Sequence, residues 1–351
     1  MTLRIQEPRV PQRPDAAALA GGLVPIAVPS PPPTSVIRNF LQKRGNSGWA
    51  DSTFRWLMLL CALSIFAIVA LIATELVSSS RLSLHKFGFG FFLRSAWDPV
   101  TNNFGALPFI YGTLASSILG LIIAVPLAVG VAVFITEMCP RLLRGPLSFL
   151  TELLAAIPSV VYGLWAIFVL VPLLRGYVNP VLIKILGWTG LFQTPDFGIG
   201  LFAAGVILAI MILPIISSLT REVMTAVPSA QREAVLALGA TRWEMIRVGV
   251  LRNARIGIVG SIILGLGRAL GETMAVAMVI GSNPTIHRNL LAPAATMASV
   301  IANEFAEAAD DTYRSALVEI GLALFLVTIV VNILARLLVW GVTRGTPPRT
   351  A

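Results

Sequence analysis

Two ionisable residues lie in a stretch of sequence that is otherwise suited to hydrocarbon. The stretch IGIVGSIILGLGRALGETMAVAMVIG runs from Ile256 to Gly281 and contains Arg268 and Glu272. On one continuous helix Arg268 would lie about 18 Å from Ile256, near the bilayer midplane, and Glu272 would follow on the same face. Each charge costs about 3 kcal/mol at that depth, so both residues need a physical reason to be there.

Oxyanion binding is the chemistry that this pair suits best. A guanidinium offers a planar fork of donors that matches the geometry of phosphate. We therefore predict that Arg268 meets an anion in transit and that Glu272 orients the fork and prevents overly tight binding. The structural alternative is a buried ion pair that only fixes helix packing. Gly267 and Gly271 form a small-xxx-small motif that would let a partner helix approach Arg268 closely.

Glu152 is a third candidate for the substrate pathway. It lies in TELLAAIPSVVYGLW, a few residues from one end of an apolar run, so it could also simply reach water. Pro158 in the same run lacks a backbone donor, and we expect it to kink the helix. Glu319 and Arg336 lie near the ends of the last apolar run, where their side chains are expected to snorkel to the interface.

The elements that must position these residues are membrane-spanning helices. The chain has 351 residues, of which 56% are hydrophobic and 12% charged, and its mean hydropathy is +0.84. Soluble domains carry about 25% charged residues. Continuous apolar runs long enough to cross about 30 Å of hydrocarbon predict an all-α polytopic protein with six spans. The runs are Trp56–Val77, Phe109–Ile135, Phe149–Leu174, Ile199–Leu219, Ile256–Gly281 and Leu317–Val342.

Basic residues predict the orientation of these spans. Of the 26 lysines and arginines, 17 fall in the two tails, the 2–3 loop and the 4–5 loop, and 7 fall in the other three loops. The positive-inside rule then places both termini in the cytoplasm. We expect residues 1–53 to be a disordered, proline-rich cytoplasmic tail, residues 54–342 the transmembrane domain, and residues 343–351 a short cytoplasmic tail.

Several other functions are disfavoured by the sequence. No predicted span contains histidine or aspartate, so an intramembrane hydrolase lacks its base. We expect no catalytic residue and no metal site, and the absence of nucleotide-binding motifs indicates that the chain itself binds no cofactor. No basic patch with interleaved aromatic residues indicates nucleic acid. A stand-alone secondary transporter remains an alternative, although the 4–5 loop would have no role in one.

That loop, residues 220–255, is too charged to cross the membrane. Its sequence TREVMTAVPSAQREAVLALGATRWEMIRVGVLRNAR predicts two short helices, Gln231–Leu238 and Arg242–Val250, bent at Gly239 and lying at the membrane surface. An ordinary amphipathic loop resting on headgroups would have a similar pattern. The run Glu233-Ala234-Val235-x-x-x-Gly239 resembles the EAA signature of ABC-importer permeases, with Val235, Gly249 and Arg252 at positions where that family usually has other residues.

This resemblance implies a coupling helix that docks on an ATPase subunit. The loop residues to which it assigns that role are Glu233, Ala234, Gly239, Thr241, Arg242, Trp243 and Glu244.

Four segments together resemble the C-type permease subunit of Pst phosphate importers. They are FGALPFIYGTL, ELLAAIPSVVYGLW, EAVLALGATRW and GRALGETMAV, within a likeness that spans roughly residues 54–342. The resemblance implies a type I ABC-importer permease architecture in a bacterial inner membrane. It also implies a second permease subunit, two ATPase subunits that bind ATP and Mg, and an extracytoplasmic phosphate-binding protein. Sulfate or molybdate is the rival substrate.

The outer loop from Asn289 to Arg314 carries Glu304, Glu307, Asp310 and Asp311. These carboxylates would suit docking of a basic surface of the binding protein. A solvated acidic loop without a partner is an equally simple interpretation.

Overall fold

The computed structural model describes residues 48–343, so the predicted tail residues 1–47 and 344–351 lie outside the described part. The chain divides into two units, residues 1–66 and 67–351. The described part of the first unit is the first half of helix α2 (Gly48–Ser79). Because α2 begins at Gly48, the last six residues of the predicted tail are helical.

Six helices are long and apolar enough to cross a membrane, as the sequence predicted. They span Asp51–Ser79, Leu107–Met138, Ser159–Thr189, Leu201–Thr225, Arg242–Leu270 and Asp311–Gly341. Within residues 48–343 every named element is a helix. The all-α prediction is therefore confirmed for this part of the chain.

The remaining elements follow in chain order. They are α3 (Arg81–Phe87), η1 (Gly88–Phe92), α4 (Leu107–Val133), η2 (Phe134–Met138), α5 (Arg141–Ala156), α6 (Ser159–Trp165), η3 (Ala166–Leu170), α7 (Val171–Leu173), η4 (Leu174–Val178), α8 (Asn179–Leu186), η5 (Gly187–Thr189), α9 (Leu201–Thr225), α10 (Ser229–Ala237), α11 (Arg242–Glu244), η6 (Met245–Leu251), α12 (Arg252–Leu270), α13 (Met274–Ile280), α14 (Met297–Glu304) and α15 (Asp311–Thr343).

Pro158 breaks the predicted third span instead of kinking it. Ile157 and Pro158 are both extended, with ψ of 130° and 141°, because the ring of a proline disfavours the helical region for the residue before it. The span therefore begins at Ser159 and continues to Thr189. Residues 141–156 form the separate helix α5, in which no side chain is buried.

The predicted fifth span is also wrong at both ends. The helix begins at Arg242 and runs through η6 and α12 to Leu270, so the second loop helix is the start of the span and not a separate surface helix. It stops at Gly271, and α13 starts only at Met274. Arg268 therefore lies in the last turn of α12, and Glu272 lies outside any helix.

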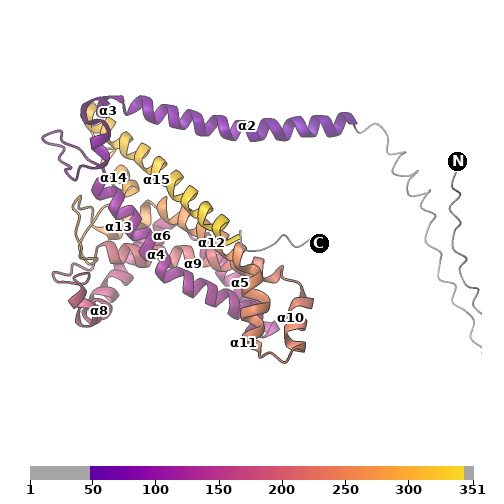
Figure 1. Ribbon diagram of the computed structural model, residues 1–351. Coiled ribbons are helices and arrows are strands. Elements are labelled where there is room, and N and C mark those ends of the chain that lie inside the picture. The colour runs from indigo at the N-terminus through magenta and orange to yellow at the C-terminus, as the bar shows by residue number, and fades with distance from the viewer. Residues whose placement is uncertain (1–47, 344–351) are drawn as a thin grey trace, which may run out of the picture. The chain divides into compact units, whose positions relative to one another are not determined.

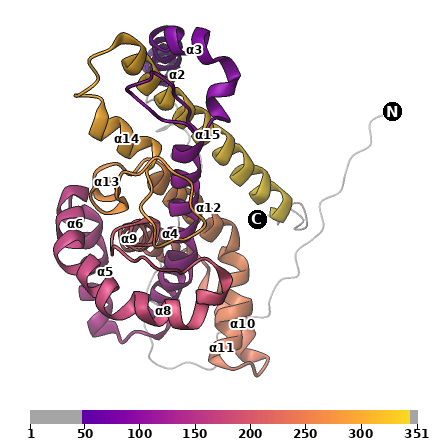
Figure 2. The same ribbon diagram turned by 90° about the vertical axis from the view of Figure 1, so that its left-hand side faces the viewer.

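Helix α9 forms the centre of the second unit. Fourteen of its 25 residues are buried, including Ile207, Ile212 and Ile216. In Figures 1 and 2, α9 lies among α4, α6 and α13, with which it shares the largest apolar core. Figure 1 shows α10 and α11 at one end of this bundle and α8 and α14 at the other.

Small residues allow α4 and α9 to pack closely. A methyl group on Gly205 of α9 would come within 2.5 Å of the Leu119 side chain of α4. Without a large hydrophobic driving force between helices in lipid, such close backbone approach supplies much of the packing energy. The α4–α9 contact therefore depends on the absence of a side chain at Gly205.

We expect Gly205→Ala to lower the free energy of unfolding by about 1–3 kcal/mol, because it overpacks a tight contact. Thermal unfolding of the purified protein would measure the effect. Gly130→Ala is the matched control, since a methyl group there meets no atom within 4 Å. Alanine is the better helix former, so the control should be neutral or stabilising. Equal effects of the two variants would contradict the packing argument.

Candidate functional site

Arg268 and Glu272 are not paired, so the structure shows neither the alternative of a buried ion pair nor the predicted orientation of the guanidinium by Glu272. Arg268 is exposed on the surface of α12 and has no hydrogen bond or ion pair to any residue between 48 and 343. Glu272 is buried, and its Oε1 accepts from the backbone N–H of Ala275 at 3.4 Å. The prediction failed because it assumed a continuous helix, whereas the chain leaves the helix at Gly271.

The face of α12 around Arg268 is exposed in the part of the chain that the structure describes. Leu264, Gly267 and Gly271 are exposed beside it, and a methyl group on Gly267 would meet no atom within 4 Å. The small-xxx-small motif therefore has no partner helix among the described residues. An arginine on the outside of a spanning helix is costly against lipid, so this face requires water or another protein.

Glu152 lies on α5 and not inside a span. Its Oε1 forms an ion pair of 2.6 Å with Nη2 of Arg221, from α9. The Glu152 side chain is 58% exposed, so water screens the pair and its contribution to stability is small. The two residues join α5 to α9 at the end of the bundle that carries α10.

Gly239 makes the predicted bend between the loop helices. Its φ is +81°, in the region that favours glycine. Thr241 then caps the next helix: its side chain accepts from the Glu244 N–H, while a Glu244 carboxylate oxygen accepts from the Thr241 N–H at 2.8 Å. This capping box fixes the direction of the long helix that follows.

The residues assigned to coupling form an exposed surface on this bend. Glu233, Ala234, Gly239, Thr241, Arg242, Trp243 and Glu244 are all exposed. Trp243 is 61% exposed and Leu238, which the sequence analysis did not single out, is 88% exposed. Large apolar side chains left uncovered beside charged ones are typical of a docking surface.

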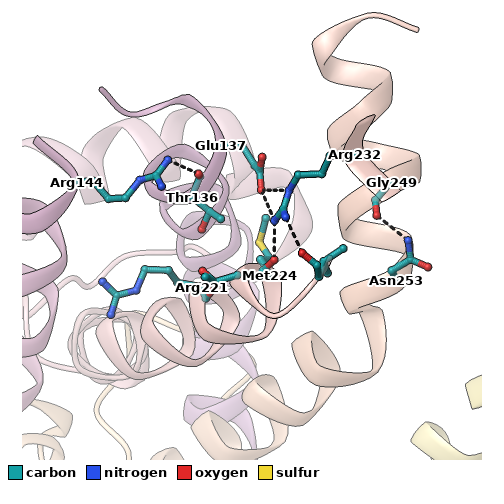
Figure 3. A network of polar contacts seen from close by, with 10 residues as sticks. Thr136, Glu137, Arg144, Arg221, Met224, Arg232, Gly249 and Asn253 are labelled. Atoms are coloured by element: carbon teal, nitrogen blue, oxygen red, sulfur yellow. Dashed lines mark hydrogen bonds and ion pairs between the residues drawn. The ribbon is translucent and has the colours of Figure 1, made fainter. Parts of the chain in front are cut away.

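Behind this surface, an ion pair that sequence analysis missed holds α10 in place. Arg232 of α10 contacts Glu137 of η2 at 3.0 Å and also donates to the carbonyls of Met224 and Val227 (Figure 3). The Arg232 and Glu137 side chains are 21% and 8% exposed. Because 95 residues separate them, no local pattern could have indicated the pair.

The packing of α10 also explains a departure from the family pattern. A methyl group on Gly249 would lie 3.4 Å from Val235 Cγ2 and 3.5 Å from the Gln231 carbonyl oxygen. A larger side chain at 249 would push α10 away from η6. Next to it, Asn253 donates to the Gly249 carbonyl at 2.6 Å (Figure 3).

The four carboxylates of the outer acidic loop differ in their surroundings: one is hydrogen-bonded to aromatic side chains and three are exposed. Glu304 Oε2 accepts hydrogen bonds from Trp97 Nε1 at 2.9 Å and from the Tyr313 hydroxyl at 2.6 Å. Glu304 is therefore part of an aromatic cluster and not free for docking. Glu307, Asp310 and Asp311 are exposed.

Glu319 is fully buried in α15, where snorkelling was predicted. Neither of its carboxylate oxygens has a hydrogen-bond partner among residues 48–343. The prediction was wrong because α3 covers this part of α15, which the sequence of α15 alone cannot show. Among the described residues no group of three or more metal-binding side chains is found.

Comparisons with a family model and with curated proteins find related transport proteins. Residues 120–344 match the family described as binding-protein-dependent transport system inner membrane component. The chain is 46% identical to the phosphate transport system permease protein PstC of Mesorhizobium japonicum, over 82% of this chain and 89% of the relative. It is also 46% identical to PstC of Haemophilus influenzae, over 85% and 96% of the two chains.

A solved structure shows the same fold at low sequence identity. It is the crystal structure of a bacterial ABC transporter involved in the import of the acidic polysaccharide alginate, with a TM-score of 0.57 and 18% identity. The match covers 85% of this chain and 100% of that chain. The predicted fold class, a six-span ABC-importer permease, is confirmed.

The Arg232–Glu137 pair generates a stability prediction. Arg232→Gln and Glu137→Gln should each lower the free energy of unfolding by about 1–3 kcal/mol, because each leaves a partly buried charge unpaired. The double variant should lose less than the sum of the two, by about 0.5–3 kcal/mol. Thermal unfolding of the four proteins would measure this, and strict additivity would show that the pair does not act as a unit.

Proposed function

Since this chain belongs to the binding-protein-dependent transport inner membrane components, and among them to the PstC permeases, we propose that it is a permease subunit of an ATP-driven phosphate importer. The observation that carries the proposal is the exposed arginine in the last turn of a spanning helix. A lone guanidinium there matches a tetrahedral oxyanion. The surrounding small residues leave it accessible.

The anion pathway runs along the open face of α12. Arg268 is the anion-binding residue, and it acts at the contact with a second permease subunit, which completes the wall that this chain leaves open. Glu272, bound to the N–H of Ala275, holds the segment between α12 and α13 in place. Glu152 and Arg221 lie at the end of the pathway that carries α10, where their exposed pair can open to water.

The bend at Gly239 is the docking surface for an ATPase subunit. In this proposal the partner ATPase subunits bind ATP and Mg, and this chain provides the surface that receives their motion. An amphipathic helix that seats in a groove is a recurrent docking mode. Leu238 and Trp243 are the apolar anchors of this surface, and the Arg232–Glu137 pair keeps α10 rigid behind them.

The bias of basic residues places the α10 end of the bundle, and with it both termini, in the cytoplasm. The opposite end then faces the extracytoplasmic phosphate-binding protein. Glu307, Asp310 and Asp311 are the exposed carboxylates available there for a basic surface of that protein.

Phosphate uptake by the complete transporter tests the proposal. Radiolabelled phosphate would be offered to cells that lack their own high-affinity system and express this chain with its partners, with excess sulfate as competitor. ATP-dependent uptake that resists sulfate is expected. Uptake abolished by sulfate would overturn the assignment of phosphate as the substrate and leave the permease assignment in place.

We expect Arg268→Gln to reduce phosphate uptake by about 10–100-fold, which corresponds to the loss of a charge-assisted hydrogen bond worth about 1.5–3 kcal/mol. Arg268→Lys keeps the positive charge but lacks the planar set of guanidinium donors, so its phosphate uptake should be intermediate. Arg336→Gln removes an exposed arginine from another spanning helix, α15, and should have little effect. Normal uptake by an Arg268→Gln transporter that assembles fully would overturn the pathway assignment.

Trp243→Ala should weaken the binding of the ATPase subunits more than tenfold, because truncating an interface tryptophan commonly costs about 2 kcal/mol or more. Affinity of the purified ATPase for permease in nanodiscs would measure it. The control is Trp188→Ala, since Trp188 is 85% exposed in η5 at the other end of the bundle. A similar loss in both variants would place the docking surface elsewhere.

A further inference from the structure

A cavity of about 860 Å³ opens at the end of the bundle that carries α10. Its walls come from η2, α5, α9 and the first turn of α10. Arg141, Arg144, Arg221 and Arg232 line it, against two carboxylates, Glu137 and Glu222. Arg268 is not among the lining residues. The cavity is therefore a second basic region, separate from the one assigned to the pathway.

Three of these arginines have guanidinium N–H donors that make no hydrogen bond in the described part of the chain. A guanidinium carries five N–H donors. Arg144 donates one hydrogen bond, to the Thr136 carbonyl (Figure 3). Arg221 has one ion-pair contact, with Glu152. Arg141 has no hydrogen bond or ion pair to any residue in the described range.

Arg232 differs from the other three. Its Nε and both terminal nitrogens are engaged by Glu137 and two backbone carbonyls. It therefore belongs to the frame of the cavity, and its charge is already compensated by Glu137.

The rest of the lining also favours an anion. Ser148 and Ser229 add hydroxyl groups, and Thr136 Oγ1 is buried without a hydrogen-bond partner in the described part of the chain. A hydroxyl in this position can donate a hydrogen bond to an acceptor oxygen in the cavity. Arg141 and Ser229 are the first residues of α5 and α10, and helix N-termini carry partial positive charge.

We propose that this cavity binds a phosphate-type oxyanion through Arg141, Arg144 and Arg221. The chemistry is that of a tetrahedral anion with several acceptor oxygens, which three guanidinium groups and nearby hydroxyls can share. Because Arg232 and Glu137 form one wall, the bound anion also braces the pair that holds α10. Occupancy of the cavity is thereby linked to the rigidity of the coupling surface.

Two sources can supply this chemistry. One is free inorganic phosphate on the α10 side, and this source rests on the proposed function because there it would be the transported product. The other is the headgroup of an anionic phospholipid. The neighbouring helix α5 exposes Leu142, Phe149 and Leu153, an apolar face of the kind that lies against acyl chains.

The test uses the complete transporter without nucleotide, in nanodiscs of phosphatidylcholine alone. Thermal unfolding would be followed as potassium phosphate replaces potassium chloride at constant ionic strength. We expect phosphate to raise the unfolding midpoint, and Arg141→Gln/Arg144→Gln to lower the apparent affinity at least tenfold. Arg141→Lys/Arg144→Lys should restore part of it. Arg252→Gln removes an exposed arginine outside the cavity and should leave the affinity unchanged.

A second set of nanodiscs, containing phosphatidylglycerol, separates the two sources. If the lipid headgroup is the occupant, the wild-type transporter is already stabilised, added phosphate gives no further shift, and native mass spectrometry finds the lipid retained by the wild type and lost by the double glutamine variant. If free phosphate is the occupant, its effect is the same in both lipids.

The proposal is overturned if phosphate shifts the wild type and the double glutamine variant equally and neither retains phosphatidylglycerol. This outcome differs from failure of the proposed function. Binding at the cavity should persist in Arg268→Gln, and a transporter that binds phosphate here yet imports another anion would overturn the substrate assignment alone.

Discussion

Hydrocarbon tolerates neither an unpaired backbone group nor an unpaired charge, and this constraint governs the whole subunit. Long apolar helices satisfy it, so each departure from such a helix requires compensation nearby. At Pro158 the chain turns extended, and the Tyr162 hydroxyl donates to the Leu154 carbonyl across the break. At the end of α12 the Glu272 carboxylate accepts an amide of the next helix. Arg268, in contrast, has no hydrogen bond or ion pair to any residue from 48 to 343.

The same constraint explains how the proposed coupling surface and the proposed anion pathway are joined. A single helical run from Arg242 to Leu270 contains Trp243 near one end and Arg268 near the other. At a rise of 1.5 Å per residue these side chains lie about 38 Å apart along the helix. A displacement imposed on the bend at Gly239 is therefore transmitted along one element and crosses no loop. The capping box of Thr241 and Glu244 fixes the end at which such a displacement enters.

How much could be predicted from the sequence depends on how far apart in the sequence the interacting residues lie. Apolar length specified six spans, and the glycine after a short amphipathic run specified the bend, because both are local properties. The continuity of a helix is harder to predict. In the apolar run at 149–174 the sign of a break was Pro158, because the residue before a proline is disfavoured in a helix. The run at 256–281 gave no comparable sign at Gly271. The expectation that Arg268 and Glu272 lie on one helical face was wrong because it assumed an unbroken helix.

Long-range contacts were beyond sequence reasoning for a different reason. Arg232 and Glu137 lie on elements that only the packing of α4 against α9 brings together, and the covering of Glu319 by α3 is of the same kind.

The subunit's arginines differ chiefly in how many of their donors are used. All three guanidinium nitrogens of Arg232 are hydrogen-bonded, and this residue fixes α10. Arg221 is shared between Glu152 and the cavity, and Arg268 and Arg141 have no partner in the described part of the chain. A charge held by several fixed acceptors serves structure, because releasing it would cost the desolvation already incurred. A charged group with unused hydrogen-bond donors can exchange partners with little loss of free energy. The gradation from Arg232 to Arg268 therefore separates the arginines that hold the structure from those that we propose to bind and release an anion.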